Sequence, residues 1–172
     1  MPDRSTLKRA AADRRAGKSA STQAGEFVRQ EMHHIREGKH GAKNAKQAIA
    51  IGLSEARRAG VALKPPKKGK ATRKTRKSAE RAYRAGQRHA KKKASARRSR
   101  AIEGVLRREG HSAASHRALS RQAHRAAEKR TRTSRSAAAR KASRTKGFAE
   151  RSLAARKAAR TRAAHRRASH RA

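Results

Sequence analysis

The sequence predicts a mostly α-helical protein, with a small helical hairpin at about residues 22–63 and a long basic tail, either disordered or made of interrupted helices. Three observations lead to this fold class. Apolar residues recur at helical spacing chiefly in the first part of the chain, no proline follows residue 66, and 51 Lys and Arg stand against 11 Asp and Glu among 172 residues.

Charge divides the chain unevenly and supports this organisation. Residues 1–63 carry 13 basic and 6 acidic side chains, a net charge of +7, whereas residues 64–172 carry 38 basic and 5 acidic ones, a net charge of +33. The segments that we expect are a basic flexible N-terminal arm at 1–21, the helical hairpin domain at 22–63, a Pro/Lys-rich linker at 64–77 and an Arg/Lys/Ala-rich helical or disordered tail at 78–172.

The first helix of the hairpin is predicted from "TQAGEFVRQEMHHIREG", residues 22–38. Its apolar residues Phe27, Val28, Met32 and Ile35 are spaced by about four and seven positions, which places them on one helical face. Gly38 is a suitable C-terminal stop, because glycine readily adopts the left-handed conformation that ends many helices.

The second helix is expected to run from residue 45 to about residue 59. Asn44 followed by Gln47 has the spacing of a capping box, with Asn replacing the usual Ser or Thr, and Gly60 supplies the stop. Gly52 lies in the middle of this helix, where it lowers helix propensity by about 1 kcal/mol relative to alanine. Close approach of another backbone is the reason we expect for it.

The hairpin is expected to be weakly stable by itself. It contains few large apolar residues, so their burial alone does not offset the entropy lost on ordering the chain, even if Val61 and Leu63 fold back across the helix end. Hydrogen bonds and the burial of alanine must close the gap. We therefore expect the hairpin to need a partner, a second copy of itself or nucleic acid.

The positions of proline and of the basic residues predict the linker and the tail. "KPPKKGK" at 64–70 breaks the helix, and the residues beyond it are good helix formers whose like charges repel each other in free solution. Two tail segments are the best helix candidates: "SRAIEGVLRREG", which ends at Gly110, and "SAASHRALSRQAHRAAEKR", which starts from Ser112.

The tail contains an internal repeat. "RSAAARKASRTK" at 135–146 recurs as "RSLAARKAARTR" at 151–162, with 9 of 12 positions identical. Such a duplicated basic unit suits repeated contact with a regularly charged polymer, and slippage in a compositionally biased gene explains it equally well.

The formal net charge of +40 indicates a nucleic-acid partner, since Lys and Arg release the counterions condensed on phosphates. If about ten phosphates are neutralised, log affinity falls with log salt at a slope near −9. The aromatic residues Phe27, Tyr83 and Phe148 are too far apart in the sequence for a base-stacking platform. We therefore expect contacts with the phosphate backbone and little reading of base sequence.

"GKHGAKNAK" at 38–46 places lysines around the N-terminus of the second predicted helix, where backbone N–H groups favour an anion. A connecting turn that happens to be basic is the simpler interpretation, because the terminal Gly-Lys-Ser/Thr of a phosphate-binding loop is missing. The nucleic-acid-binding residues that we predict are Lys39, Lys43, Lys46, Arg57, Arg58, Lys67, Lys68, Lys70, Arg135, Arg140, Lys141, Arg144, Arg151, Arg156, Lys157, Arg160 and Arg162.

Several classes of site are not expected. The chain has no cysteine, which excludes disulfides, thiolate metal ligands, zinc fingers and cysteine nucleophiles. His33, His34 and His40 lack a recognised ligand spacing and read as surface histidines, so no metal site is predicted. No carboxylate pair or activated nucleophile emerges, so we expect neither an enzyme nor a cofactor.

The sequence also bears on location. No secretory signal and no run of 18 apolar residues is found, so we expect a cytoplasmic protein without membrane association. An Arg-rich N-terminus also fits an organellar transit peptide, but Asp3 and Asp13 argue against this interpretation.

The segment "KQAIAIGLSEARRAG" at 46–60 resembles a family of small basic domains of unknown function from bacteria and phages, which carry the motif KQAIAIxLSEARRAG. The resemblance covers roughly residues 26–64 and brings no catalytic residues with it. "GHSAASHRALSRQAHRAA" at 110–127 and the "AARKAxRT" units look like tails appended to such domains. Their composition is similar to that of bacterial linker-histone-like tails, which implies DNA association.

Together these observations predict a non-enzymatic, histone-like protein that binds nucleic acid, mainly duplex DNA, without sequence specificity. The alternatives left open are an RNA- or ribosome-associated protein and an interaction module for an anionic protein partner, because phosphate contacts do not distinguish the sugars. Self-association through the hairpin is a further expectation.

Overall fold

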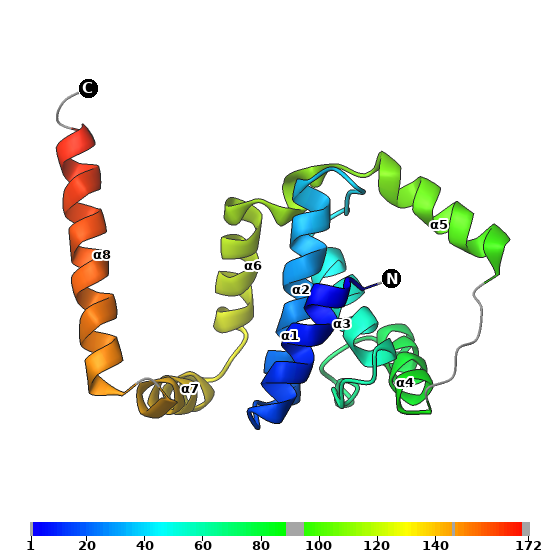
Figure 1. Cartoon of the computed structure of the whole chain (residues 1–172), viewed down its shortest axis with the longest axis horizontal. Helices are drawn as coiled ribbons and strands as arrows, with labels where there is room; N and C mark the ends of the chain where they lie inside the picture. Colours follow the sequence, from blue (N-terminus) through cyan, green and yellow to red (C-terminus); the bar gives the residue numbers. More distant parts are fainter. Residues whose placement is uncertain (1, 89–94, 146, 170–172) are drawn as a thin grey trace. The chain divides into compact units, whose positions relative to one another are not determined.

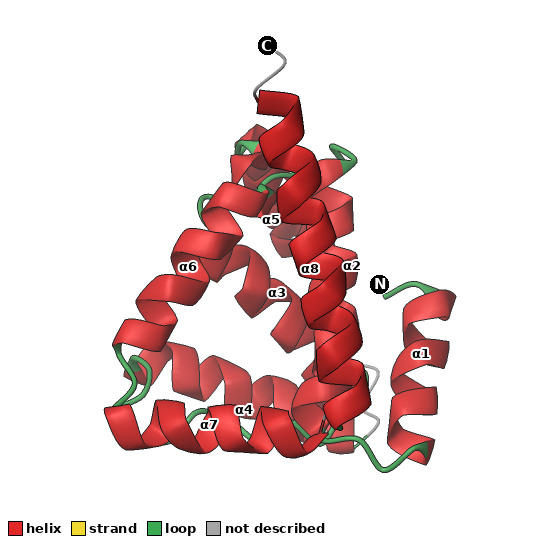
Figure 2. Ribbon diagram, turned by 90° about the vertical axis from the view of Figure 1, so that its left-hand side faces the viewer, coloured by secondary structure: helices red, strands yellow, loops and turns green. Residues whose placement is uncertain are grey.

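The computed structural model describes residues 2–88, 95–145 and 147–169, and every regular element within them is a helix (Figure 2). This confirms the mostly α-helical fold class. The chain separates into two compact units, Met1–Ala123 and His124–Ala172. The α-helices, labelled in Figure 1, are α1 Arg4–Arg15, α2 Ala20–Arg36, α3 Ala45–Arg58, α4 Arg73–Gln87, α5 Ala96–Arg108, α6 His116–Glu128, α7 Arg132–Thr145 and α8 Phe148–Ser169. A 3₁₀ turn, η1 His111–Ala114, lies between α5 and α6.

Helices α2 and α3 pack against each other as the two arms of the predicted hairpin. The Ser19 hydroxyl caps α2 by accepting the N–H of Thr22 at 3.3 Å. The Asn44 side chain caps α3 by accepting the N–H of Gln47 at 3.0 Å, and Gln47 Oε1 accepts the N–H of Lys43 at 3.1 Å. The expected capping residue is therefore correct, although the reciprocal bond reaches one residue further back than in the usual capping box.

The two helices end where glycine allows the chain to turn. Gly38 and Gly60 have φ values of 76° and 90°, in the left-handed region. After Gly60, the N–H of Val61 donates to the carbonyl of Ala56 at 3.1 Å, and the Val61 side chain is buried. The segment after α3 thus folds back across the helix end, as expected.

Gly52 marks the closest approach of α2 and α3. A Cβ built on Gly52 would lie 2.7 Å from the Cα of Val28, so only glycine fits here without a shift of the backbone. The expected close approach of another backbone is confirmed, and that backbone belongs to the other arm of the hairpin.

The N-terminal segment contains a docked helix rather than only a flexible arm. α1 packs along α2, with Thr6 and Ala10 buried. Arg9 Nε lies 2.6 Å from Glu26 Oε2 on α2. Small side chains at the contact let the two helices approach, and such a contact leaves no hydrophobic periodicity to read in the sequence.

The extended segment after α3 is shorter than the predicted linker, because the last five residues assigned to that linker are already helical. α4 begins after its cap Thr72 and packs on α3. Its contact face is made of small residues, Ala79, Ala82 and Gly86. A Cβ on Gly86 would collide with the backbone carbonyl of Arg57.

The core consists of two apolar clusters, and both draw on segments outside the hairpin. In addition to these apolar contacts, Arg36 Nε donates a hydrogen bond to the carbonyl of Ala114 at 2.9 Å, which holds η1 against the end of α2. The chain therefore supplies for itself the cover that the hairpin was expected to need. The buried members are Met32, Ile35, Ala42, Ala48, Ala113 and Ala114 in one cluster, and Ala10, Ala24, Phe27, Ala56 and Val61 in the other.

The tail segment within the first unit begins with α5, which ends shortly before Gly110 as expected. α6 begins at residue 116 rather than at Ser112, because η1 buries Ala113 and Ala114 against the core. On α5, Ile102 and Val105 remain exposed.

The second unit, His124–Ala172, contains α7 and α8. α7 includes residues 135–145 of the first copy of the repeat, and α8 includes the second copy, residues 151–162. Of the two predicted states of the tail, interrupted helices are correct for the described residues, and disorder is wrong. Alanine and arginine both favour helix, and no proline interrupts them. No helix among the described residues has the length and apolar character to cross a bilayer.

Candidate functional site

The lysines of the loop between α2 and α3 do not surround an open anion pocket. Lys39, Lys43 and Lys46 are exposed, and Lys39 Nζ lies 3.0 Å from Glu37 Oε2. Two N–H groups at the start of α3 are already bonded to the side chains of Asn44 and Gln47. This arrangement favours the simpler interpretation, a basic connecting turn.

Other backbone donors of the same loop are also occupied. The N–H of Gly41 donates to the carbonyl of Leu106 at 2.8 Å, and the N–H of Ala42 donates to the carbonyl of Gly110 at 3.2 Å. Gly41 is needed for this contact, because a Cβ there would collide with the carbonyl of Glu109. The loop is thus a docking point for the end of α5.

Arg57 is not available to nucleic acid, contrary to the prediction. Its side chain is buried, with Nε donating to the carbonyl of Leu63 at 3.1 Å and Nη1 to the carbonyl of Leu53 at 3.4 Å. Burial lowers the pKa of its guanidinium from the ordinary value. Arg57 therefore holds the turn after α3, whereas its neighbour Arg58 is exposed.

Lys67, Lys68 and Lys70 are exposed on the loop between α3 and α4. Gly69, with φ of 83°, and a bond from the N–H of Lys70 to the carbonyl of Lys67 at 3.1 Å make this a tight turn. The three ammonium groups lie on an exposed loop and are not gathered in a pocket.

The remaining predicted residues lie on α7 and α8, and we call them the tail cations. All are exposed, and none forms an ion pair with a described carboxylate. Arg140, Lys141 and Arg144 of the first copy and their counterparts in the second occur at positions i, i+1 and i+4, which span an arc of about 100° on each helix. The tail cations are Arg135, Arg140, Lys141, Arg144, Arg151, Arg156, Lys157, Arg160 and Arg162.

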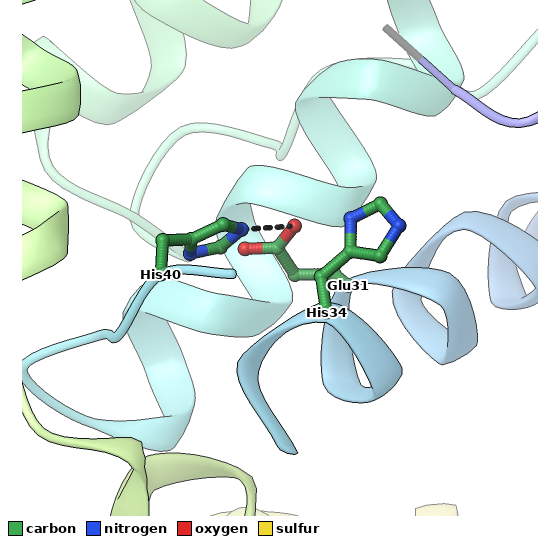
Figure 3. A group of neighbouring side chains, drawn as sticks. All are labelled: Glu31, His34 and His40. Atoms are coloured by element: carbon green, nitrogen blue, oxygen red, sulfur yellow. Dashed lines mark ion pairs between the residues drawn. The ribbon is translucent and has the colours of Figure 1, made fainter. Parts of the chain in front are cut away.

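Glu31, His34 and His40 form a cluster of polar side chains that was not predicted from the sequence. One ligand atom from each of the three side chains lies within 4.8 Å of the other two. Glu31 and His34 come from α2, and His40 comes from the loop that follows it. Figure 3 shows the Glu31 carboxylate between the two imidazole rings.

The Glu31 carboxylate is buried and has few partners. Glu31 is 2% exposed, and its Oε1 has no hydrogen-bond partner. Its Oε2 lies 3.7 Å from His40 Nε2. Burial raises the pKa of Glu31 to about 7, His40 opposes the shift, and the nearby Glu55 carboxylate adds to it.

The two histidines are oriented by neighbouring oxygens. His40 Nδ1 lies 3.1 Å from the carbonyl oxygen of Gly41, and His34 Nε2 lies 3.4 Å from Asp3 Oδ2. The rings are nearly perpendicular, with centroids 6.3 Å apart. The sequence signal for this cluster was Glu31 and His34 at i and i+3 on one helical face, followed by the turn at Gly38 that returns the chain.

Comparison with known proteins gives one finding. Residues 14–69 match the model of a family of unknown function (DUF6496). No curated protein and no solved structure matches the chain. The matched segment contains the whole hairpin, the Glu31 cluster and the proline loop, so the similarity to this family concerns the first unit and stops before α4.

Proposed function

We propose that the protein is a non-enzymatic, histone-like protein of the bacterial nucleoid that binds duplex DNA through its phosphates, with little regard to base sequence. The observation that carries this proposal is the set of exposed tail cations on α7 and α8, none of which is neutralised by a described carboxylate. Counterion release by such cations provides the binding free energy.

The charge of the second unit supports the proposal. Residues 124–172 contain 17 Lys and Arg and 2 Asp and Glu, so the net charge is 17 − 2 = +15 in 49 residues. The residues between the cations are mostly alanine, serine and threonine, which offer little apolar surface for a core. Soluble surfaces usually intersperse both signs of charge, and a large excess of positive charge favours binding to nucleic acid.

The aromatic residues support backbone contact rather than base stacking. Phe27 is fully buried, Tyr83 is half-buried, and Phe148, 81% exposed, has no aromatic neighbour within its own helix. Proteins that bind single strands without sequence preference use several exposed aromatic side chains. The contacts that remain are charge-assisted hydrogen bonds from Arg and Lys to phosphate oxygens.

RNA, or an anionic protein, is the alternative occupant of the same surface. Self-association through the hairpin has less support, because the exposed large apolar residues among the described ones are Leu7, Ile102, Val105, Phe148 and Leu153, and none of them lies on α2 or α3.

The structure also determines where a truncation can be made. A cut after residue 63 would remove Ala113 and Ala114 from the core, as well as α4 from the face of α3. A cut after Arg130 keeps α1 to α6 and removes α7 and α8, with 14 basic residues and 1 acidic residue, a net charge of +13.

The test is a gel-retardation competition with the full chain and with residues 1–130. The full chain should retard a random duplex at low salt, and residues 1–130 should bind it at least about tenfold more weakly. Unlabelled duplex DNA should displace the probe better than folded RNA at equal nucleotide concentration. Better displacement by RNA would favour the RNA alternative, and equal binding by both chains would contradict the assignment to α7 and α8.

A further inference from the structure

We propose that Glu31, His34 and His40 form a binding site for a divalent transition metal, with Zn²⁺ the ion that this ligand set favours. This inference concerns the first unit and is independent of nucleic-acid binding. His34 and His40, expected at the surface, are partly buried.

The distances of the cluster are close to those of a zinc site. Zinc–nitrogen and zinc–oxygen bonds of about 2.0–2.2 Å place tetrahedral ligand atoms roughly 3.4 Å apart. The three candidate atoms already lie within 4.8 Å of one another, and Glu31 Oε2 and His40 Nε2 lie 3.7 Å apart. Closing the site requires inward shifts of about 1 Å, which His34 and His40 can make because both are only partly buried.

The hydrogen bonds of the histidines present one free ring nitrogen each to the cluster. If His40 Nδ1–H donates to the Gly41 carbonyl, its Nε2 lone pair faces Glu31. If His34 Nε2–H donates to Asp3, its Nδ1 lone pair is left, and Figure 3 shows a ring nitrogen of His34 directed at the Glu31 carboxylate. Metal-bound histidines usually have such an outer partner, a carboxylate or a backbone carbonyl.

The buried carboxylate is the second, independent observation. Glu31 is 2% exposed, and no donor from the protein reaches its Oε1. A buried carboxylate oxygen without a partner carries a desolvation cost that the fold does not offset. A cation between Glu31 and the two rings would satisfy it, and His40 as an imidazolium, 3.7 Å from the other oxygen, would satisfy it only in part.

The ligand types select the metal. Two imidazoles and one carboxylate are typical of zinc sites that keep a fourth position for water, whereas Mg²⁺ and Ca²⁺ prefer all-oxygen ligands. Here the fourth ligand would be water, because the side chains of His34 and His40 are 17% and 20% exposed.

A metal at this position would act on the fold. It would tie α2 to the loop whose Gly41 and Ala42 hold the end of α5 through Leu106 and Gly110. Because the ion would bind the folded chain and not the unfolded chain, it would raise the free energy of unfolding by mass action. We therefore expect the ion to stabilise the α2–α3 loop in the position where it contacts the end of α5.

The first experiment uses the full-length chain without a histidine tag, stripped with chelator and dialysed. Zn²⁺ should bind with 1:1 stoichiometry in a calorimetric titration and should raise the melting temperature, whereas Mg²⁺ should do neither. Absence of a zinc-dependent melting shift, or an equal response to Mg²⁺, would overturn the proposal.

Matched variants then locate the site. H34Q, H40Q and E31Q should each weaken the 1:1 zinc affinity by about tenfold or more. H33Q removes the exposed neighbouring histidine on α2 and should leave the affinity unchanged. E31Q removes a buried charge, so it should fold at least as well as the parent without metal, which separates lost binding from unfolding. Zinc affinity that survives H34Q, H40Q and E31Q, or falls equally with H33Q, would refute the assignment.

Discussion

Glu31 shows how much the environment of one residue depends on contacts far along the chain. In the sequence it is one of four glutamates near the hairpin, on a helix whose other acidic residue, Glu26, is paired with Arg9 and Arg29. The fold instead buries Glu31 between α2 and α3, close to Glu55. Its ionisation therefore works against folding.

The pH dependence of the metal-free chain should report this cost. Glu31 has a pKa of about 7 in the folded chain against an ordinary value of 4.5. Below pH 4.5 the carboxyl is protonated in both states, and between 4.5 and 7 only the unfolded chain loses the proton. The free energy of unfolding should therefore fall as pH rises through this window, by a few kcal/mol, and stay reduced above it.

E31Q should remove this part of the pH dependence. Urea unfolding in chelator, from pH 4 to pH 8, should show a flatter profile for E31Q and a higher stability than the parent at pH 8. If the free energy of unfolding changed with pH in the same way for both chains, the pKa of Glu31 would not be raised by burial.

Arg57 and Arg58 show the limit of sequence reading at the scale of single residues. They are adjacent, identical in type and equally suited to bind phosphate by composition. Only the fold shows that Arg57 is turned inward to the carbonyls of Leu53 and Leu63, while Arg58 is exposed. Charge counting alone cannot separate a structural arginine from a binding one.

At the scale of elements, α2 and α3 could be predicted because both carry large apolar residues at helical spacing and recognisable caps. α1 and the packing of α4 could not, since their contact faces are made of alanine, threonine and glycine. Small residues permit close helix packing but produce no hydrophobic pattern. Of the two states expected for the tail, disorder was wrong for the described residues, because the helix propensity of alanine and arginine outweighs the repulsion between like charges there.

The contact between α2 and α3 makes a prediction about two glycines. Gly52→Ala places a Cβ 2.7 Å from the Cα of Val28 and should destabilise the chain by about 1–3 kcal/mol, because the helices must separate. Gly25→Ala, at an exposed position of α2 with no neighbour within 4 Å, should stabilise it by up to about 1 kcal/mol. Thermal or urea unfolding compares them, and stabilisation by both substitutions would contradict the described packing.

The repeat makes a prediction about α7 and α8. The triple variants R140Q/K141Q/R144Q and R156Q/K157Q/R160Q remove equivalent cations from the two copies, with little change in helix propensity. If both copies contact phosphate, each triple should make the slope of log affinity against log salt shallower by up to about 2.7.

The charge-conserving variant R140K/R144K is the control, and its slope should match that of the parent. An effect confined to one triple would show that the copies are not equivalent in binding, and would favour duplication without function for the other copy.

At the scale of the whole molecule, the two units differ in what holds them. Residues 1–123 form a core from small and medium apolar residues that lie far apart in the sequence, with Ala113 and Ala114 covering the hairpin. None of the described residues in the range 124–172 is buried, and the cations among them are exposed. The first unit is a folded domain with an apolar core, and we propose that the second unit provides most of the affinity for a polyanion.

The most direct measurement is the affinity of the full chain for a random DNA duplex across a series of salt concentrations. If about ten phosphates are neutralised at once, log affinity should fall linearly with log salt at a slope near −9. A chain that fails to bind at low salt, or that binds equally tightly at low and high salt, would contradict the claim that unpaired tail cations hold the nucleic acid.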